Sequence, residues 1–203
     1  MTPSAPVVGY RFWRVDPADI WTGGQLESPF SETLWPPRDR LEAVCKSGLM
    51  LRTSRPKAHK LDAPKGSPVE GCSCGIYAYH EIKSMLREVN EQRLLLGGAV
   101  LCWGRIVIHP EGIRAQFARP LALCLPDQRH MHSWGRGHLE EVAHSYGVPL
   151  LEPEYLVAYA SEFGACYKPD LTRPSPTAPV RGALDGRHFG QLLRDLFRKL
   201  LGG

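Results

Sequence analysis

Four residues between positions 45 and 74 have the types and spacing of a metal site: Cys45, His59, Cys72 and Cys74. Thiolate and imidazole ligands suit tetrahedral Zn²⁺, and three cysteines with one histidine make a closed structural site. Residues 46–71 carry three prolines, three glycines and almost no apolar periodicity, so an ordered loop of this length needs something to fix it. The sequence therefore predicts a structural zinc ion here.

Other interpretations of Cys72 and Cys74 stay open at this point. A single residue separates them, whereas paired zinc ligands mostly have two or more residues between them. They are alternatively small buried residues at a tight turn, since free cysteine is among the most buried residue types. A redox pair normally has two intervening residues. A nucleophilic cysteine activated by a following helix is the remaining alternative.

The elements that must position these residues follow from periodicity and turn residues. Alternating β-forming side chains predict a strand at 8–15, and only a short helical turn is expected just before Cys45. Apolar residues at three- and four-residue steps predict a helix from Gly75 to about Leu94. Two strand-like runs around Pro110 and Gly112 predict a β-hairpin within 99–125. Further short helices are expected at 137–146 and 153–163, the second with Phe163 facing inward.

Together these elements predict an α+β domain at residues 7–166, with a small antiparallel sheet, a hairpin and several short helices. A proline-rich linker at 167–186 and an amphipathic helix at 187–203 would follow. The apolar stripe of that last helix consists of Phe189, Leu192, Leu193, Leu196, Phe197, Leu200 and Leu201. A helix this short is not stable alone, so the stripe is expected to dock on something.

Composition narrows the class of protein. The 203 residues are 43% hydrophobic with a formal net charge of +4, and no apolar run is long enough to span a bilayer. The first residues lack the layout of a secretion signal, so we expect a cytoplasmic protein whose six cysteines are not disulfides. The phosphate-binding, dinucleotide-binding and nucleophile-elbow motifs are absent from the sequence, which gives no support to those chemistries.

A second pattern interleaves aromatic and basic residues. "GYRFWRV" and "CWGRIVIH" place Arg11, Trp13, Arg14 and Arg105 on strand-like segments. Exposed side chains of this kind stack on bases and neutralise phosphates, although tryptophan in a strand is more often part of the core. Nucleic-acid binding is therefore an alternative function.

The segments "CSCGIYAY" and "GGAVLCWGRIVIHPEGIRAQFARP" resemble those of a group of small uncharacterised bacterial proteins, frequent in actinobacteria. Members of that group carry an upstream Trp-Pro and Cys, a "CGIYA" segment and a "GEVxLWGRVxxHxxGxRAxxAxP" hairpin. The resemblance covers roughly residues 9–126. Ala99 stands where the group has an acidic residue, and Cys102 precedes Trp103. The resemblance implies one domain and favours a structural metal, but it implies no activity.

The sequence thus favours a non-catalytic binding or adaptor protein that is stabilised by zinc. Its C-terminal helix would lie in a groove of a protein partner or of a second copy. Nucleic-acid binding is the first alternative, and a metal-dependent or thiol enzyme, which requires an open ligand position, is the second.

Overall fold

The computed structural model describes residues 6–15, 24–45, 67–69, 72–91, 95–126 and 135–167. They all belong to the first of two units, Met1–Pro169. The second unit, Asp170–Gly203, and with it the predicted C-terminal helix, lies outside the described residues. The predicted α+β class is confirmed in the described part, which contains a seven-stranded sheet and helices on its faces.

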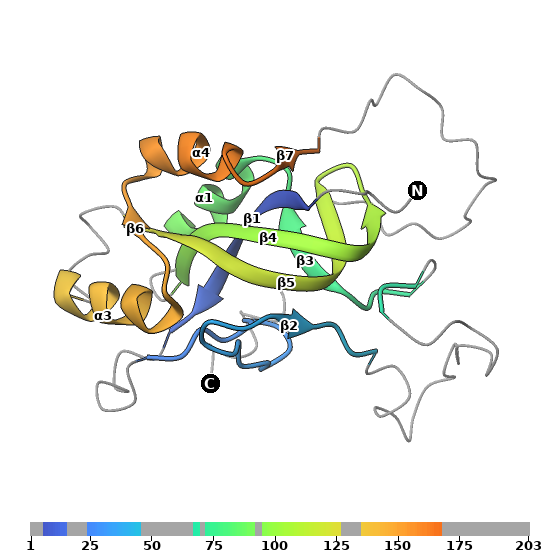
Figure 1. Cartoon of the computed structure of the whole chain (residues 1–203), viewed down its shortest axis with the longest axis horizontal. Helices are drawn as coiled ribbons and strands as arrows, with labels where there is room; N and C mark the ends of the chain where they lie inside the picture. Colours follow the sequence, from blue (N-terminus) through green and yellow to red (C-terminus); the bar gives the residue numbers. More distant parts are fainter. Residues whose placement is uncertain are drawn as a thin grey trace. The chain divides into compact units, whose positions relative to one another are not determined.

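Four antiparallel strands form the centre of the sheet in the order β5-β3-β1-β4. They are β1 (Val7–Arg14), β3 (Ile76–Tyr79), β4 (Leu95–Ile108) and β5 (Gly112–Cys124). The last strand of this order, β4, also pairs with β5, so the pairing closes on itself. The predicted first strand and the hairpin are confirmed, and Figure 1 shows β4 and β5 running side by side as the longest strands.

Three two-residue strands extend this centre. Leu41–Glu42 (β2) pairs antiparallel with β5, Leu150–Leu151 (β6) pairs parallel with β5, and Ala165–Cys166 (β7) pairs parallel with β1. The helical turn predicted before Cys45 is therefore wrong. The backbone of Leu41 and Glu42 pairs with Ala118 and Phe117 instead, so tertiary pairing overrides the weak local helical pattern.

The first predicted helix begins seven residues later than expected: α1 runs from Ile82 to Glu91. Residues Ile76–Tyr79 form β3, because Ile76 and Ala78 alternate inward and pair with β5. Gly75 precedes the strand at φ +125°, a conformation outside the helical region. The helix is predicted too long because apolar residues of this short strand also fall at helical spacing from those of α1.

The two later helices are confirmed. α3 spans Arg136–Tyr146 and ends at Gly147, which adopts the left-handed conformation and whose N–H bonds back to the last turn. α4 spans Pro153–Ser161, with its proline in the first turn, where a missing N–H costs nothing. Phe163 lies beyond the end of α4 and is exposed, so its predicted inward position is wrong.

Side chains alternate between two hydrophobic clusters across β1. Val8, Tyr10 and Phe12 pack with α1 and α4, whereas Val7 and Trp13 face the opposite cluster with α3 and Trp35. Figure 1 shows α4 above the strands and the segment that contains β2 below them. Gly97 lets α1 approach β4 closely, because a side chain there would overlap Met85.

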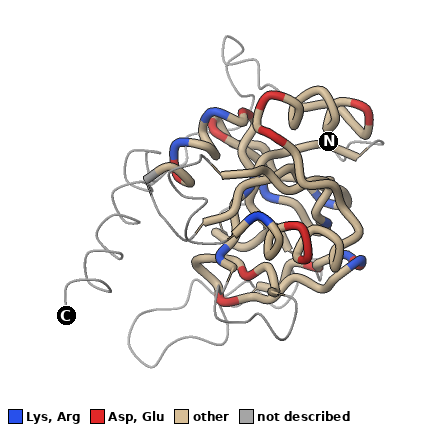
Figure 2. The backbone as a smooth tube through the Cα atoms, turned by 90° about the vertical axis from the view of Figure 1, so that its left-hand side faces the viewer, with Lys and Arg blue, Asp and Glu red and all other residues tan. Residues whose placement is uncertain are grey.

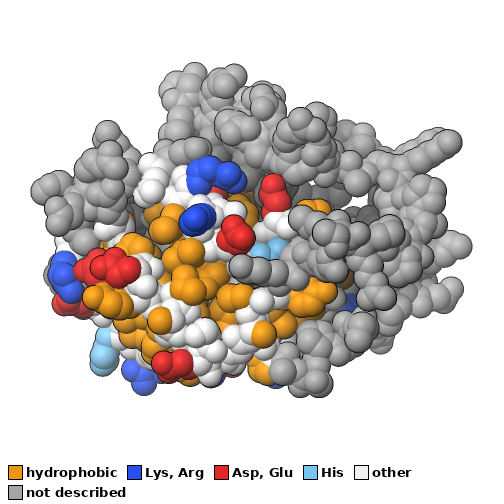
Figure 3. Space-filling model, turned by 90° about the horizontal axis from the view of Figure 1, so that it is seen from above, with side chains coloured by type: hydrophobic (Ala, Val, Ile, Leu, Met, Phe, Trp, Pro, Cys, Tyr) orange, Lys and Arg blue, Asp and Glu red, His pale blue; other side chains and the backbone are white. Residues whose placement is uncertain are grey.

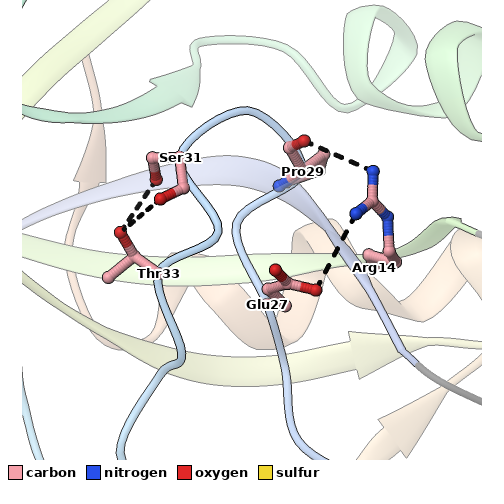
Figure 4. Close-up of polar contacts among 5 residues, drawn as sticks. All are labelled: Arg14, Glu27, Pro29, Ser31 and Thr33. Atoms are coloured by element: carbon pink, nitrogen blue, oxygen red, sulfur yellow. Dashed lines mark hydrogen bonds and ion pairs between the residues drawn. The ribbon is translucent and has the colours of Figure 1, made fainter. Parts of the chain in front are cut away.

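A turn between β1 and β2 contacts the end of β1 at Arg14 (Figure 4). Arg14 and Glu27 exchange two backbone hydrogen bonds of 2.9 Å, and their side chains form an ion pair at 3.9 Å. Ser31 Oγ lies 2.9 Å from Thr33 Oγ1 at the tip of this turn. The turn leads the chain to Trp35 and then to β2, and so toward Cys45.

Candidate metal centre

The structure brings three of the four predicted ligands together. The Sγ atoms of Cys45, Cys72 and Cys74 all lie within 4.8 Å of one another, and those of Cys45 and Cys72 are 3.8 Å apart. Sulfur atoms bound at about 2.3 Å from a tetrahedral ion lie roughly 3.8 Å from each other. The three cysteines, all free thiols and all half-buried, could therefore hold a metal ion.

Strand pairing explains why residues so far apart in the sequence meet. β4 occupies one edge of β5, so β2 and β3 add along the other edge, at 117–118 and at 112–115. Both run antiparallel to β5, which places the end of β2 next to the start of β3. Cys45 follows β2, and Cys72 and Cys74 precede β3. The register of two short strands thus positions the cluster.

Two side chains hold the backbone of residues 72–74 by donating hydrogen bonds to its carbonyl oxygens. Arg114 Nη1 donates to the carbonyl oxygens of Cys72 and Cys74, at 2.8 Å for Cys74. The hydroxyl of Tyr77 donates to the carbonyl of Ser73 at 2.7 Å. All three carbonyls of the segment that carries two of the thiols therefore accept a hydrogen bond from a side chain.

Arg114 lies in β5 and is only 4% exposed, although it is charged. Its Nε donates to Nε2 of His109 at 2.7 Å, and its guanidinium lies 5.8 Å from the centre of the Tyr77 ring. His109 must therefore carry its proton on Nδ1 when it is neutral. Burial, together with Arg114 and His80, lowers the pKa of His109 below its ordinary value, which keeps it an acceptor for Arg114.

While no metal is bound, the thiol of Cys72 loses its proton less readily than an ordinary cysteine thiol. Burial raises its pKa above the ordinary value, and the neighbouring thiols of Cys74 and Cys45 add to this, against a lowering by a backbone hydrogen bond at Cys74. A metal ion must displace that proton to bind. The nucleophile interpretation loses its basis as well, because the residues that follow Cys74 form β3 and not a helix.

Nothing in the described residues tests His59 as a ligand, since His59 lies outside them. The apolar stripe of the predicted C-terminal helix, from Phe189 to Leu201, lies outside them too. Cys102 and Cys124 are buried in the sheet, where burial raises the pKa of each thiol to about 12. Both are core residues.

Of the four residues proposed to contact nucleic acid, Trp13 is buried and the three arginines are half-buried. Trp13 is 0% exposed and packs edge-on against Trp35 at 5.4 Å, so it cannot stack on a base. Arg11 lies over the Trp35 ring and donates to Ser28 Oγ at 3.0 Å, and burial lowers its pKa to about 10.

The two remaining arginines of this set also have partners: Arg14 pairs with Glu27, and Arg105 donates to the carbonyl of Pro68 at 3.4 Å. In Figure 2 the basic and acidic positions of the described elements are interspersed and do not gather into one basic face. Burial therefore removes Trp13 as a stacking residue, and nucleic-acid contact by the three arginines stays a prediction.

Sequence reasoning missed two features. Arg114 is the first, because an arginine within a strand gives no sign of whether it faces the core or the solvent. The second is an apolar surface around α4, formed by the exposed side chains of Tyr155, Val157, Phe163 and Tyr167. Figure 3, which views the molecule from above, shows hydrophobic side chains gathered on the face that α4 occupies.

No protein-family model matches the chain, and neither a curated protein nor a solved structure matches it. The resemblance to the bacterial group therefore stays an expectation. None of the helices in the described ranges has the length and apolar content needed to cross a membrane. The fold and the site together define an α+β protein with a candidate metal centre.

Proposed function

We propose that this chain is a non-catalytic binding protein whose cysteine cluster holds a structural zinc ion. The observation that carries the proposal is the approach of the Cys45, Cys72 and Cys74 sulfurs to within 4.8 Å. Three thiolates favour a soft or borderline ion over Mg²⁺ or Ca²⁺, which bind oxygen ligands. His59 is the fourth ligand we propose, as the sequence suggests.

A structural role fits the connectivity of the site. Cys45 and Cys72 are 27 positions apart, and an ion bound to both would join the end of β2 to the start of β3. The unfolded chain does not hold these thiols together, so the ion binds the folded chain preferentially and its binding free energy stabilises the fold. The raised pKa of Cys72 is also unfavourable for a thiol enzyme at neutral pH.

The binding half of the proposal rests on apolar surface. The sequence 187–203 has an amphipathic pattern with seven apolar residues on one stripe, and we propose that it engages a protein partner or a second copy, in the cytoplasm. The exposed side chains around α4, with Tyr155 at 61% exposure, are a second apolar surface that supports a binding role.

The metal half is tested by titrating metal-free protein with Co²⁺, whose thiolate complexes absorb in the near ultraviolet and visible range. We expect one Co²⁺ per chain, displaced by Zn²⁺, and we expect Cys45→Ser to weaken binding strongly. Cys166→Ser is the matched control, because Cys166 is half-buried like the ligands but lies in β7, outside the cluster. Equal binding by the Cys45→Ser and Cys166→Ser proteins would refute the site.

The binding half is tested by comparing the full chain with residues 1–186 in sedimentation equilibrium and in cross-linking. If the C-terminal stripe mediates self-association, the full chain forms dimers that the shortened chain does not form. If the partner is a different protein, the full chain forms a complex with it and the shortened chain does not. Association that survives removal of residues 187–203 would contradict this half of the proposal.

A further inference from the structure

Among the residues that the structure describes, no carboxylate pairs with the buried guanidinium of Arg114. It is 4% exposed, and in the described part of the chain its hydrogen bonds end on two carbonyl oxygens and one imidazole nitrogen, not on a carboxylate. These acceptors solvate the donors but do not neutralise the charge. A buried cation without a counter-charge is costly, so such groups are normally paired.

The neighbouring centre supplies the missing charge once it is loaded. Three thiolates around a divalent ion leave one net negative charge when the fourth ligand is neutral. The carbonyls that Arg114 contacts belong to two of the three ligand residues, so the guanidinium lies directly against the backbone of the site. The net negative charge of the metal-loaded centre then balances the positive charge of the Arg114 guanidinium.

We propose that Arg114 is the charge-balancing and positioning residue of the metal centre, and that Tyr77 assists it by fixing the peptide between the two cysteines. This inference rests on the proposed zinc site. It assigns to the centre a divalent ion with three thiolates and one neutral ligand, such as an imidazole or a water molecule. Residues of this outer kind orient the ligands, and their loss commonly weakens metal binding by roughly 10–100-fold.

The geometry requires both the charge and the shape of the arginine. One nitrogen, Nη1, reaches two carbonyls, while Nε reaches His109 on the other side. A lysine keeps the charge but has no fork and cannot make these bonds together. Gly75 gives the side chain its space, because a Cβ at Gly75 would lie 2.9 Å from Cβ of Arg114.

The test measures zinc affinity by competition with a chelator in the full-length protein and in the variants Arg114→Met, Arg114→Lys and Tyr77→Phe. Arg119→Met is the control, since Arg119 lies on the same strand as Arg114 but is exposed and pairs with Leu101 of β4. We expect affinity to fall roughly 10–100-fold for Arg114→Met. Arg114→Lys should recover part of that loss, Tyr77→Phe should lose less than Arg114→Met, and the control should match the parent protein.

The visible spectrum of the Co²⁺-loaded proteins provides a readout that a general loss of stability would not change. Displacement of the 72–74 backbone should shift the ligand-field bands of Arg114→Met and Tyr77→Phe, while Arg119→Met keeps the parent spectrum. If Arg114→Met does not fold, Arg114→Lys and Tyr77→Phe decide the question.

Two results would overturn the inference. Parent-like zinc affinity and spectra in the folded Arg114 and Tyr77 variants would remove the positioning role, and equal affinity of Arg114→Lys and Arg114→Met would remove the charge-balancing role. A parent protein that binds neither Zn²⁺ nor Co²⁺ would instead refute the metal centre itself, so the two failures are distinguishable.

Discussion

The cluster around Trp13 and the cysteine cluster lie in one domain but are held together differently. Trp13 and Trp35 are fully buried and pack edge to face, and the hydroxyl of Tyr146 bonds to the backbone of both Leu26 and Trp35. In the other region Cys45, Cys72 and Cys74 are half-buried, and hydrogen bonds from Arg114 and Tyr77 hold the segment 72–74.

This difference separates two sources of stability. Apolar burial stabilises the tryptophan region by itself, at about 25 cal/mol for each Å² removed from water. The cysteines of the cluster are only half-buried and their hydrogen bonds contribute modestly, and in our proposal a bound ion supplies further stability. The tryptophan region is therefore expected to keep its structure without metal, and the cysteine region is expected to depend on it.

The largest effect is expected from removing a large, fully buried side chain. Trp13→Ala removes a side chain of 0% exposure and leaves a cavity against Trp35, which should lower the free energy of unfolding by about 3–5 kcal/mol. Denaturant unfolding of the zinc-loaded protein measures this loss. The number of metal ions per folded chain should not change. A loss of less than about 1 kcal/mol in the free energy of unfolding would contradict the assignment of this region as the core.

Metal removal should produce the next largest effect. With free zinc at about 100 times the dissociation constant, binding adds about 2.7 kcal/mol to the free energy of unfolding, and a chelator removes that contribution. Thermal unfolding of the parent protein and of Cys74→Ser with and without chelator measures it. The parent should respond to the chelator and Cys74→Ser should not, so equal responses would break the contrast between the two regions.

A smaller loss is expected from the polar contacts inside the core. Tyr146→Phe removes the hydroxyl that accepts from Leu26 N–H at 2.9 Å and donates to the Trp35 carbonyl at 2.7 Å. Both backbone groups would be left buried without that partner, at a cost of about 1–3 kcal/mol. Denaturant unfolding in zinc and in chelator should give the same loss. A loss that appears only with zinc would couple this contact to the metal centre instead.

The smallest effect concerns pH. Because folding raises the pKa of Cys72, the metal-free fold keeps this proton to higher pH than the unfolded chain does. Its contribution to stability is complete below the ordinary thiol value near 9.0 and is lost as the pH rises through the folded value. Iodoacetamide labelling of metal-free protein, followed by mass spectrometry, should show Cys72 reacting more slowly than a free thiol at pH 8 and faster as the pH rises. Rapid labelling at pH 7 would contradict the shift.

Much of the fold could be predicted because strong local signals agreed with it. The alternation of β1, the turn at Pro110 and Gly112, and the glycine after α3 all point to the observed elements. The predicted helix begins too early because Ile76 and Tyr79, three residues apart, fit the helical period, and only pairing with β5 shows that they form a strand.

The candidate site was predicted in part. Residue type and spacing identified Cys45, Cys72 and Cys74, because thiols with metal-ligand chemistry are few in the chain. Arg114 was not predicted, since its role arises from the register that places β3 beside β5. Trp13 was misassigned as a nucleic-acid contact in the alternative interpretation, because the sequence does not show that both faces of β1 are covered.

The most direct test of the central claim is the metal content of the purified protein, measured by elemental analysis for the parent chain and for Cys72→Ser. The account predicts one zinc ion per parent chain and none in Cys72→Ser, with Cys166→Ser still loaded as the control. A parent protein that is folded, stable and free of metal after purification in zinc-containing buffer would contradict it.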